Sequence, residues 1–532
     1  MRNLYLPGRS TVHAPNGMAA TSHPLATTAA LDILRCGGNA MDAAIAAVAV
    51  QCVVEPQSTG IGGDCFCLYS PKGNGVIAFN GSGTAPAAAT VEWYLENGIE
   101  TIEQHSPHAV TVPGAIDAWS KLLTDHGTMS LGDILQPAIE YAREGAPVNH
   151  RQWHDWKLSE GLLSIDPTSA AQFLVDGKAP ELGTRVKLPL LAKTLEHIAE
   201  QGREGFYSGW VAKDIVSHLK NLGGLHTLKD FENYTGKYVT PISTNYRGFD
   251  VYECPPNGQG IVALAALNIL SGFNMRDHDA VSVDRLHLEI EAIRLAYRDR
   301  NTVLGDPEFG DIPVDEWLSE KHAAQERAHI NPDQRMLDIP PSRLPAHKDT
   351  VYLTVVDKDR NAVSFINTLF YMFGSGLTAP KSGVLLQNRG MGFVINPNHL
   401  NCIAPNKRPL HTIIPGMLIK DGRAQMPFGV MGGSYQACGH VHLLTNLIDH
   451  DMDLQEALDC TRVFPDVDDP KGRVQVEPGL PNEILRGLQS KGHETYIPER
   501  PIGGAQAIWI DWENNVLRGA SEPRKDGMAA GF

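Results

Sequence analysis

The sequence predicts an α+β fold in which β-sheets lie between layers of helices. Its 532 residues are too many for one small core and enough for a large multilayer body. Helical spacing dominates the middle of the chain, and the pattern changes to alternating β-type segments after residue 349. The first two of these segments predict a hairpin, which we expect near the centre of the fold.

Two helices are predicted near the start of the chain. Residues 25–35 have helical spacing and stop at Gly37 and Gly38, a pair typical of a helix C-terminus. Asn39 can cap a second helix that runs to about Val54 and is apolar on all sides, so we expect it to be buried. Glycines at 60–63 then predict a turn into a strand at 65–69, without the GxGxxG order or the lysine of a phosphate loop.

The middle of the chain is predicted to be helical. Helical spacing occurs at residues 133–144, 210–219 and 282–300, whereas residues 221–234 and 307–313 are less regular. Residues 320–334 are polar and contain no glycine, which favours a solvated helix. We expect this helix to give way to an exposed linker at 331–347.

The C-terminal part begins with the predicted hairpin. Its first strand spans 351–356, a polar turn occupies 358–361, and the second strand spans 362–368. Tyr352, Thr354 and Val356 should face one side of the sheet, opposite to the alternate residues. Helices are predicted at 434–449 and 454–462, and strands at 475–476 and 505–510 close the chain. A single fold built from both halves is favoured over two separate domains.

Composition excludes several classes of function. The chain has 45 basic and 61 acidic residues, a net charge of −16, which argues against a nucleic-acid or anionic-membrane partner. The eight cysteines include no CxxC pair, so a zinc site is not expected and most should be buried free thiols. The first residues lack the apolar core of a signal peptide, and the apolar run at 43–50 is too short to span a bilayer. We therefore expect a cytoplasmic protein.

Thr350 is the main candidate for chemistry. It stands at the start of the predicted strand, after a polar, proline-rich approach. If the bond between Asp349 and Thr350 is cut, Thr350 gains a free α-amine beside its own hydroxyl. One residue would then supply both a nucleophile and a base. The alternative is an ordinary threonine at the start of a strand.

Several motifs in order resemble the γ-glutamyltransferase family of N-terminal-nucleophile (Ntn) hydrolases. They are Gly-Gly-Asn-Ala-Met-Asp-Ala-Ala at 37–44, the turn from Glu-Pro at 55–56 to Gly-Gly at 62–63, Val-Pro-Gly at 112–114, Leu-Gln-Pro-Ala-Ile at 135–139, the stretch 350–376, Asn-Lys-Arg-Pro-Leu at 406–410, and Gly-Gly-Ser at 432–434. The resemblance implies a four-layer αββα sandwich with two central antiparallel sheets. It also implies autocleavage into residues 1–349 and 350–532, which stay together as a heterodimer or as a doubled heterotetramer.

The resemblance also implies the parts of a catalytic site. The free amine of Thr350 would act as the base for its hydroxyl, and an acyl-enzyme would form and be resolved by water or an acceptor amine. The backbone N–H groups of Gly432 and Gly433 would form the oxyanion hole, and Thr368 would support the nucleophile. The alternatives are that Gly432 and Gly433 form only a turn and that Thr368 is an ordinary strand residue. No cofactor motif appears, and this chemistry needs neither a cofactor nor a metal.

The departures from the family pattern concern the substrate. The family holds an α-carboxylate with an arginine, and here that position aligns with Ser82. The positions that hold the α-ammonium fall on Phe370, Arg389 and Gly392, and the family's paired serines become His411 and Thr412. Such a pocket should reject α-amino acids, because an ammonium group needs acceptors or a carboxylate partner.

A small acid whose carboxylate Arg389 holds in a fork fits these changes, with Phe370 narrowing the pocket. The alternative is that Arg389 is an ordinary surface or structural arginine. Among the branches of the family, the chain is most similar to the oxamate amidohydrolases, which split oxamate into oxalate and ammonia in ureide and purine breakdown. Arg389, with His411 or Thr412, would then bind the carboxylate while Thr350 attacks the amide.

Other functions remain open at this stage. Within the family, they are a γ-glutamyl hydrolase or transpeptidase and a glutaryl- or cephalosporin-type acylase. A different class is an uncleaved, non-catalytic binding protein, since an uncut Thr350 has no free amine.

Overall fold

The computed structural model describes residue 5 and residues 8–337, 351–467 and 469–532. Three predictions fall outside these residues: the catalytic Thr350, the cleavage bond between Asp349 and Thr350, and most of the predicted linker at 331–347.

Two seven-stranded sheets form the centre of the molecule, and every strand pairing within them is antiparallel. The first sheet has the order β1 (Val12–Ala14), β18 (Val516–Ser521), β17 (Gly504–Asp511), β13 (Arg423–Met431), β12 (Gly416–Lys420), β9 (Phe249–Glu253) and β8 (Ile242–Tyr246). The second has the order β19 (Met528–Gly531), β2 (Met18–Thr21), β10 (Val351–Val356), β11 (Ala362–Thr368), β3 (Asp64–Ser70), β4 (Ile77–Gly81) and β7 (Lys237–Val239). Each sheet therefore takes strands from before residue 338 and after residue 350.

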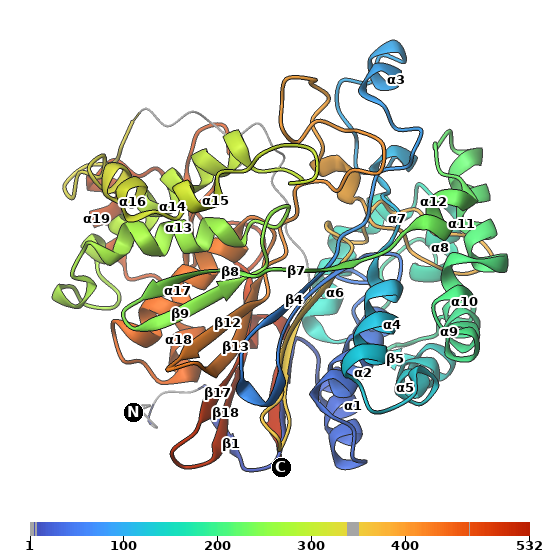
Figure 1. Ribbon diagram of the computed structural model, residues 1–532, viewed down its shortest axis with the longest axis horizontal. Coiled ribbons are helices and arrows are strands. Elements are labelled where there is room, and N and C mark those ends of the chain that lie inside the picture. Colours follow the sequence, from blue (N-terminus) through green and yellow to red (C-terminus); the bar gives the residue numbers. More distant parts are fainter. Residues whose placement is uncertain (1–4, 6–7, 338–350, 468) are drawn as a thin grey trace.

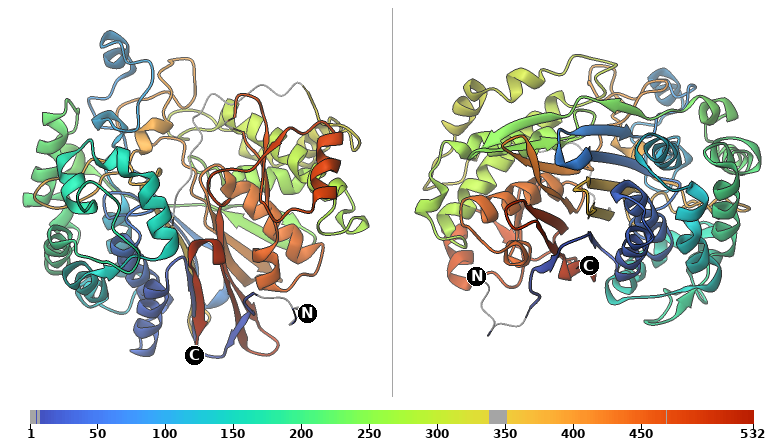
Figure 2. Two further views of the ribbon diagram at one scale, coloured as in Figure 1. Left: turned by 180° about the vertical axis from the view of Figure 1, so that it is seen from behind. Right: turned by 60° about the horizontal axis from the view of Figure 1, so that its bottom comes forward.

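Helices cover the outer face of each sheet (Figures 1 and 2). The second sheet carries α1 (Pro24–Arg35), α2 (Ala40–Val54) and α4 (Ala115–His126), with α2 directly on β10 and β11, and α5 (Leu131–Glu144) packs on α2. The first sheet carries α13 (Gly260–Ser271), α17 (Tyr435–Ile448) and α18 (Leu454–Asp459), and α14 (Val283–Val303) packs on α13 and α17. The fold is thus a four-layer αββα sandwich with two central antiparallel sheets, the arrangement that the family resemblance implies.

The remaining elements surround this body. The further helices are α3 (Val91–Glu96), α6 (His150–Leu158), α7 (Glu160–Leu163), α8 (Pro167–Phe173), α9 (Pro189–Gln201), α10 (Glu204–Tyr207), α11 (Gly209–Asn221), α12 (Leu228–Asn233), α15 (Val314–Trp317), α16 (Glu320–Arg327) and α19 (Asn482–Ser490). Short strands are β5 (Ala146–Pro147), β6 (Arg185–Val186), β14 (Val463–Pro465), β15 (Val474–Val476) and β16 (Thr495–Tyr496).

The central hairpin has the two faces that its alternation predicts. Tyr352 and Val356 lie in the apolar cluster between the two sheets, whereas Val351, Leu353 and Val355 pack in the cluster on the helical side. The two strands pair in one continuous register, from Val351 opposite Asn367 to Val356 opposite Ala362. The adjoining α2 is buried along its full length and is capped by Asn39, as predicted.

Several element boundaries differ from the sequence prediction. The polar helix expected at 320–334 ends at Arg327, and the helix expected at 454–462 ends at Asp459. The prediction that residues 505–510 close the chain is wrong, because β18 and β19 follow and pair with β17 and β2. The strands β12 and β13 and the helix α13 were not predicted.

No helix of the described residues is long and apolar enough to cross a membrane. The eight cysteines are free, and six of them are buried, as predicted. The cytoplasmic location stays a prediction.

The packing between the sheets predicts a large effect of shortening a side chain of β11. Ile366 is fully buried in the inter-sheet cluster. Changing Ile366→Ala should lower the free energy of unfolding by about 2–5 kcal/mol, because burial is lost and a cavity remains. The control is Ile497→Ala, at a side chain that is 60% exposed, which should change it by less than about 0.5 kcal/mol. Urea unfolding measures both, and equal effects would contradict this packing.

Candidate active site

Thr368 ends the central strand β11 and begins the candidate site. The ladder between β11 and β3 places Asp64 opposite Thr368. The Oγ1 of Thr368 accepts a hydrogen bond from the backbone N–H of Phe370 at 2.9 Å. Phe370 has a positive φ of 81°, so the chain turns sharply there and brings the phenyl ring under the next element of the site.

Arg389 lies over this ring. It begins a short 3-10 turn (Arg389–Gly392), is fully buried, and its guanidinium carbon lies 3.7 Å from the centre of the Phe370 ring. The Nη1 donates to the Oγ1 of Thr412 at 3.2 Å. The Nε and Nη2 atoms are buried and have no hydrogen-bond partner among the described residues. Arg389 is therefore not a surface arginine, and of the alternative stated for it only a structural role is compatible with its burial.

Arg389 keeps its positive charge at neutral pH. Burial lowers the pKa of its guanidinium to about 9, and the negative charge of Asp64 opposes this shift. A buried cation with one edge unpaired is costly unless a partner is bound there. The free edge, formed by Nε and Nη2, is the edge that binds a carboxylate through two parallel hydrogen bonds.

Asp64 is a functional candidate that the sequence analysis missed. Its Oδ1 accepts hydrogen bonds from the backbone N–H of Gly83 at 2.8 Å and from the Nε2 of Gln387 at 2.7 Å. Its Oδ2 lies 3.0 Å from the Nε2 of His411. Burial raises the pKa of the Asp64 carboxyl to about 7, while the charge of Arg389 pulls it down.

His411 is neutral and held in one tautomer. Burial, and then the charge of Arg389, put the pKa of its imidazole well below the usual range. Its Nδ1 accepts from the backbone N–H of Ile413 at 3.4 Å, so the ring hydrogen is on Nε2 and points to Asp64. His411 therefore contributes a fixed dipole and no charge.

Ser82 lies beside this cluster, and among the described residues its hydrogen bonds go to groups other than Arg389. Its hydroxyl accepts from the Nδ2 of Asn257 at 3.1 Å, and its backbone N–H donates to Asn80 at 2.9 Å. Its link to the site runs through the neighbouring Gly83, which bonds Asp64. A neutral side chain thus stands where the family has a cation.

Gly432 and Gly433 form a turn between β13 and α17. Their φ angles are +130° and +59°, and a Cβ on Gly432 would lie 3.0 Å from the Cα of Gly503. Neither N–H donates a hydrogen bond to another described residue. Two unpaired backbone donors at one turn can receive an oxyanion.

Gln259 connects this turn to the arginine and was also missed from the sequence. Its Nε2 donates to the carbonyls of Thr412 at 2.9 Å and of Gly433 at 3.1 Å. Its Oε1 accepts from Arg300 at 2.7 Å, which fixes the orientation of the amide. The side chain of Gln259 therefore sets the spacing between the glycine turn and Thr412, the partner of Arg389.

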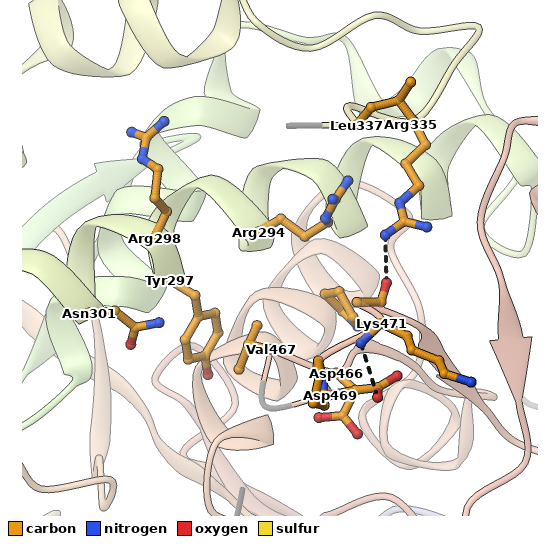
Figure 3. A pocket seen from close by; sticks show the side chains of 13 residues that line it. Arg294, Tyr297, Arg298, Asn301, Arg335, Leu337, Asp466, Val467, Asp469 and Lys471 are labelled. Atoms are coloured by element: carbon orange, nitrogen blue, oxygen red, sulfur yellow. Dashed lines mark hydrogen bonds between the residues drawn. The ribbon is translucent and has the colours of Figure 1, made fainter. Parts of the chain in front are cut away.

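A cavity lies between α14 and residues 465–467 and 469–472 (Figure 3). Its lining residues include Tyr297, Arg294, Arg298 and Arg335. The hydroxyl of Tyr297 donates to the carbonyl of Ser434, the residue after Gly433.

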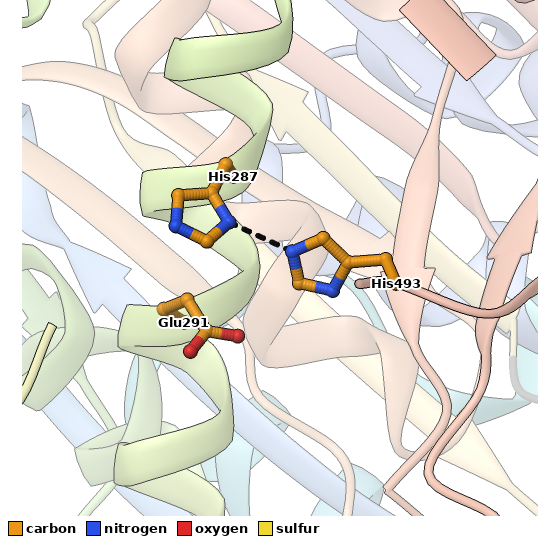
Figure 4. Close-up of side chains that lie close together, drawn as sticks. All are labelled: His287, Glu291 and His493. Atoms are coloured by element: carbon orange, nitrogen blue, oxygen red, sulfur yellow. Dashed lines mark hydrogen bonds between the residues drawn. The ribbon is translucent and has the colours of Figure 1, made fainter. Parts of the chain in front are cut away.

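A group of potential metal ligands, His287, Glu291 and His493, lies elsewhere (Figure 4). The Nδ1 of His287 and the Nε2 of His493 are 2.7 Å apart and hydrogen-bonded to each other. The two oxygens of Glu291 accept from Arg294 and from the backbone N–H of Met336. The facing atoms are thus joined in a hydrogen-bonded network, and this geometry does not favour a metal site.

Comparison with known proteins shows the family. The profile of the Gamma-glutamyltranspeptidase family matches residues 26–532. The chain belongs to this family. It is 38% identical to the glutathione hydrolase-like YwrD proenzyme of Bacillus subtilis, over 97% of this chain and 98% of that protein. It is 33% identical to the oxamate amidohydrolase proenzyme of Klebsiella pneumoniae, over 97% and 98%.

A solved structure of similar fold is the cephalosporin acylase from Bacillus halodurans. It has a TM-score of 0.92 and 40% identity, covering 100% of this chain and 98% of that one. Family members are amidohydrolases or transpeptidases that use an N-terminal nucleophile, and relatives are made as proenzymes that become two chains. The comparisons do not separate the oxamate amidohydrolase branch from the other branches.

The structure brings most of the sequence-predicted site residues together. Phe370, Arg389 and Thr412 are in direct contact, and His411 joins them through Asp64. Thr368 is hydrogen-bonded to Phe370, and Gln259 bonds both Thr412 and the glycine turn. Ser82 is linked to this group only through the neighbouring Gly83. The catalytic and binding roles of these residues stay predictions.

The raised pKa of Asp64 has a measurable consequence. In the unfolded chain this carboxyl titrates near its ordinary value of about 3.9, and in the fold near 7. The folded form holds the proton more tightly, so the contribution of Asp64 to stability is complete below about pH 4 and lost as pH rises to 7.

The measurement is the melting temperature of the wild type and Asp64→Asn between pH 4.5 and 8. The wild type should lose stability relative to the variant up to about pH 7, and the difference should then stay constant. A difference that grows in favour of the wild type as pH rises would mean an ion-paired carboxylate of low pKa.

Proposed function

We propose that the protein is a self-processing amidohydrolase that splits a small amide bearing a carboxylate, with oxamate as the preferred substrate. Its products would be oxalate and ammonia. The observation that carries the proposal is the unpaired Nε and Nη2 edge of the buried Arg389.

The charges of the site favour an acid without an ammonium group. An α-ammonium bound beside Arg389 would meet a like charge in a dry environment. The nearby carboxylate of Asp64 already accepts hydrogen bonds from Gly83, Gln387 and His411. A substrate carboxylate on Arg389, in contrast, would neutralise the guanidinium and satisfy both unpaired donors.

The size of the site favours a short substrate. Phe370 contacts both Thr368, through a hydrogen bond from its backbone N–H, and Arg389, through its ring. The side chains of Phe370 and Thr412 are only 6% and 5% exposed. In oxamate the carboxylate is joined directly to the amide carbon, so it can contact Arg389 while that carbon lies near Thr368.

In the proposed reaction, the Oγ of Thr350 first attacks the carbonyl of Asp349 and water releases residues 1–349 from 350–532. The two chains would stay together because both sheets contain strands of each. The free amine of Thr350 then takes the hydroxyl proton while Oγ attacks the amide carbon of the substrate. The N–H groups of Gly432 and Gly433 hold the oxyanion, ammonia leaves with the proton, and water hydrolyses the ester.

A second candidate is an acylase for amides of longer dicarboxylic acids, favoured by the likeness to the cephalosporin acylase. It would use the same guanidinium edge at a greater distance from the nucleophile. The likeness to a glutathione hydrolase-like protein makes γ-glutamyl amides the third class to test. All three share the nucleophile and differ in the acyl group.

The deciding experiment measures ammonia release from oxamate, malonamate, succinamate and glutaramate, with γ-glutamyl-p-nitroanilide assayed by colour. The proposal expects the highest kcat/KM for oxamate and a steady fall as the chain lengthens. A maximum at glutaramate would favour the acylase. Good turnover of the γ-glutamyl anilide with none of oxamate would overturn the proposal.

Processing tests the nucleophile independently of the substrate. Thr350→Ala should stay a single chain of full length and be inactive, because neither the attacking hydroxyl nor the new amine can form. Denaturing gel electrophoresis and N-terminal sequencing of the smaller wild-type fragment are the measurements. A wild type that stays uncut but binds small acids would indicate the non-catalytic alternative, and a fragment that begins elsewhere would displace Thr350.

Arg389 variants test recognition of the carboxylate. Arg389→Lys keeps the charge but loses the two-pronged edge, and it should lower kcat/KM for oxamate about tenfold to a hundredfold. Arg389→Met, which removes the charge as well, should lower it further. The control is the fraction of cleaved chain on a gel, which should not change. Activity that is unchanged in processed Arg389→Met would exclude this role.

A further inference from the structure

A short turn at residues 369–371 joins the strand that ends at Thr368 to the candidate binding arginine. Phe370 lies in the middle of this turn with a φ of 81°, a conformation that a bulky side chain rarely adopts. Its ring lies against Arg389, with 3.7 Å between the guanidinium carbon and the ring centre. Contacts from outside the turn are needed to hold it, because phenylalanine does not favour this backbone shape.

Asn388 bonds the turn on both sides of Phe370. Its backbone N–H donates to the carbonyl of Leu369 at 3.1 Å. Its side-chain Oδ1 accepts from the backbone N–H of Tyr371 at 3.0 Å. One asparagine thus holds the residue before Phe370 through its main chain and the residue after it through its side chain.

The side chain of Asn388 is itself fixed in orientation. Its Nδ2 donates to the Sδ of Met391 at 3.1 Å, and its backbone carbonyl accepts from the N–H of Met391 at 3.1 Å. Asn388 has no exposed surface, so water does not compete for Oδ1. Without Oδ1, the N–H of Tyr371, a residue that is only 3% exposed, would lose its acceptor, which is costly for a buried donor.

The turn that carries Arg389 rests on a fixed base. A Cβ on Gly390 would lie 2.7 Å from the carbonyl oxygen of His108 and 2.8 Å from that of Ala109, so the two backbones are in close contact. The backbone at residues 389–390 therefore has little room to move. The guanidinium itself is held partly by the Phe370 ring, and its place depends on that ring.

We propose that Asn388 is the positioning residue that sets which length of acid amide this site accepts. The inference rests on the proposed amidase function and deepens it. By holding Phe370 against Arg389, Asn388 fixes the distance from the guanidinium edge to the strand of Thr368. A short acid amide can span only that one distance, because its carboxylate is joined directly to the reacting carbon. A longer, flexible acid can adjust to a displaced guanidinium.

The first test measures kcat/KM of Asn388→Leu with oxamate and with glutaramate. Because Oδ1 is lost, kcat/KM for oxamate should fall about tenfold to a hundredfold, the effect of a misplacement of about 1 Å. For glutaramate the loss should be less than about threefold, since its chain can adjust. The ratio of the two kcat/KM values should therefore fall, and a ratio equal to that of the wild type would overturn the proposal.

Two further variants separate positioning from a general loss of stability. Asn388→Asp keeps an acceptor at Oδ1, so it should keep the wild-type ratio, although the added charge beside Arg389 should raise KM for both acids. Asn446→Leu removes another buried asparagine, whose Nδ2 donates to the carbonyl of Ala457 at 3.2 Å, and it should leave the ratio unchanged. A fall of the ratio in Asn446→Leu as large as in Asn388→Leu would contradict a specific role. If Asn388→Leu fails to fold, Asn388→Ala replaces it with the same expectation.

An experimental structure of Asn388→Leu without a ligand tests the geometry independently of the substrate. The distance between the guanidinium carbon of Arg389 and the centre of the Phe370 ring should exceed 3.7 Å, whereas Asn446→Leu should keep it. A wild type that does not split oxamate would end the proposed function. An unchanged ring contact in Asn388→Leu would overturn the present inference, whichever substrate the wild type prefers.

Discussion

The buried positive charge of Arg389 is the constraint on which the site depends. A guanidinium without exposed surface loses its hydration and must regain the energy from neighbours. The Phe370 ring covers one face, Thr412 accepts one hydrogen bond, and Asp64 supplies a negative charge within the same cluster. These contacts leave the Nε and Nη2 edge unpaired among the described residues, which is why we assign that edge to the substrate.

The fold places these groups through pairings distant in sequence. The antiparallel ladder between β3 and β11 sets Asp64 opposite Thr368, although 304 positions separate them. Gln259 then fixes the glycine turn relative to Thr412 by two hydrogen bonds from one amide. A change at Gln259 would release the glycine turn and Thr412, the partner of Arg389, together, because the same amide holds both.

The sequence alone could predict what depends on local pattern. The hairpin, the buried α2 and its Asn39 cap follow from alternation, composition and a capping residue, and the structure confirms each. Asp64 and Gln259 could not be found in this way. Asp64 looked like the last residue of a glycine turn, and Gln259 lies in a proline- and glycine-rich segment without regular spacing. Their roles arise only when distant strands and loops meet.

The final strands were missed for a related reason. β19 is made of Met, Ala and Gly, which are weak strand formers, and it is held by pairing with β2.

The prediction of the substrate type rests on substitutions at aligned positions. In the structure the side chains of Phe370 and Arg389 are in contact with each other. The hydroxyl of Ser82 instead bonds Asn257.

The most direct measurement of the central claim is an experimental structure of the processed protein with oxalate bound. The account predicts one carboxylate of oxalate within hydrogen-bond distance of both Nε and Nη2 of Arg389, and the other directed to the N–H groups of Gly432 and Gly433. Oxalate bound away from Arg389, or an amino acid that places its ammonium group in this pocket, would contradict it.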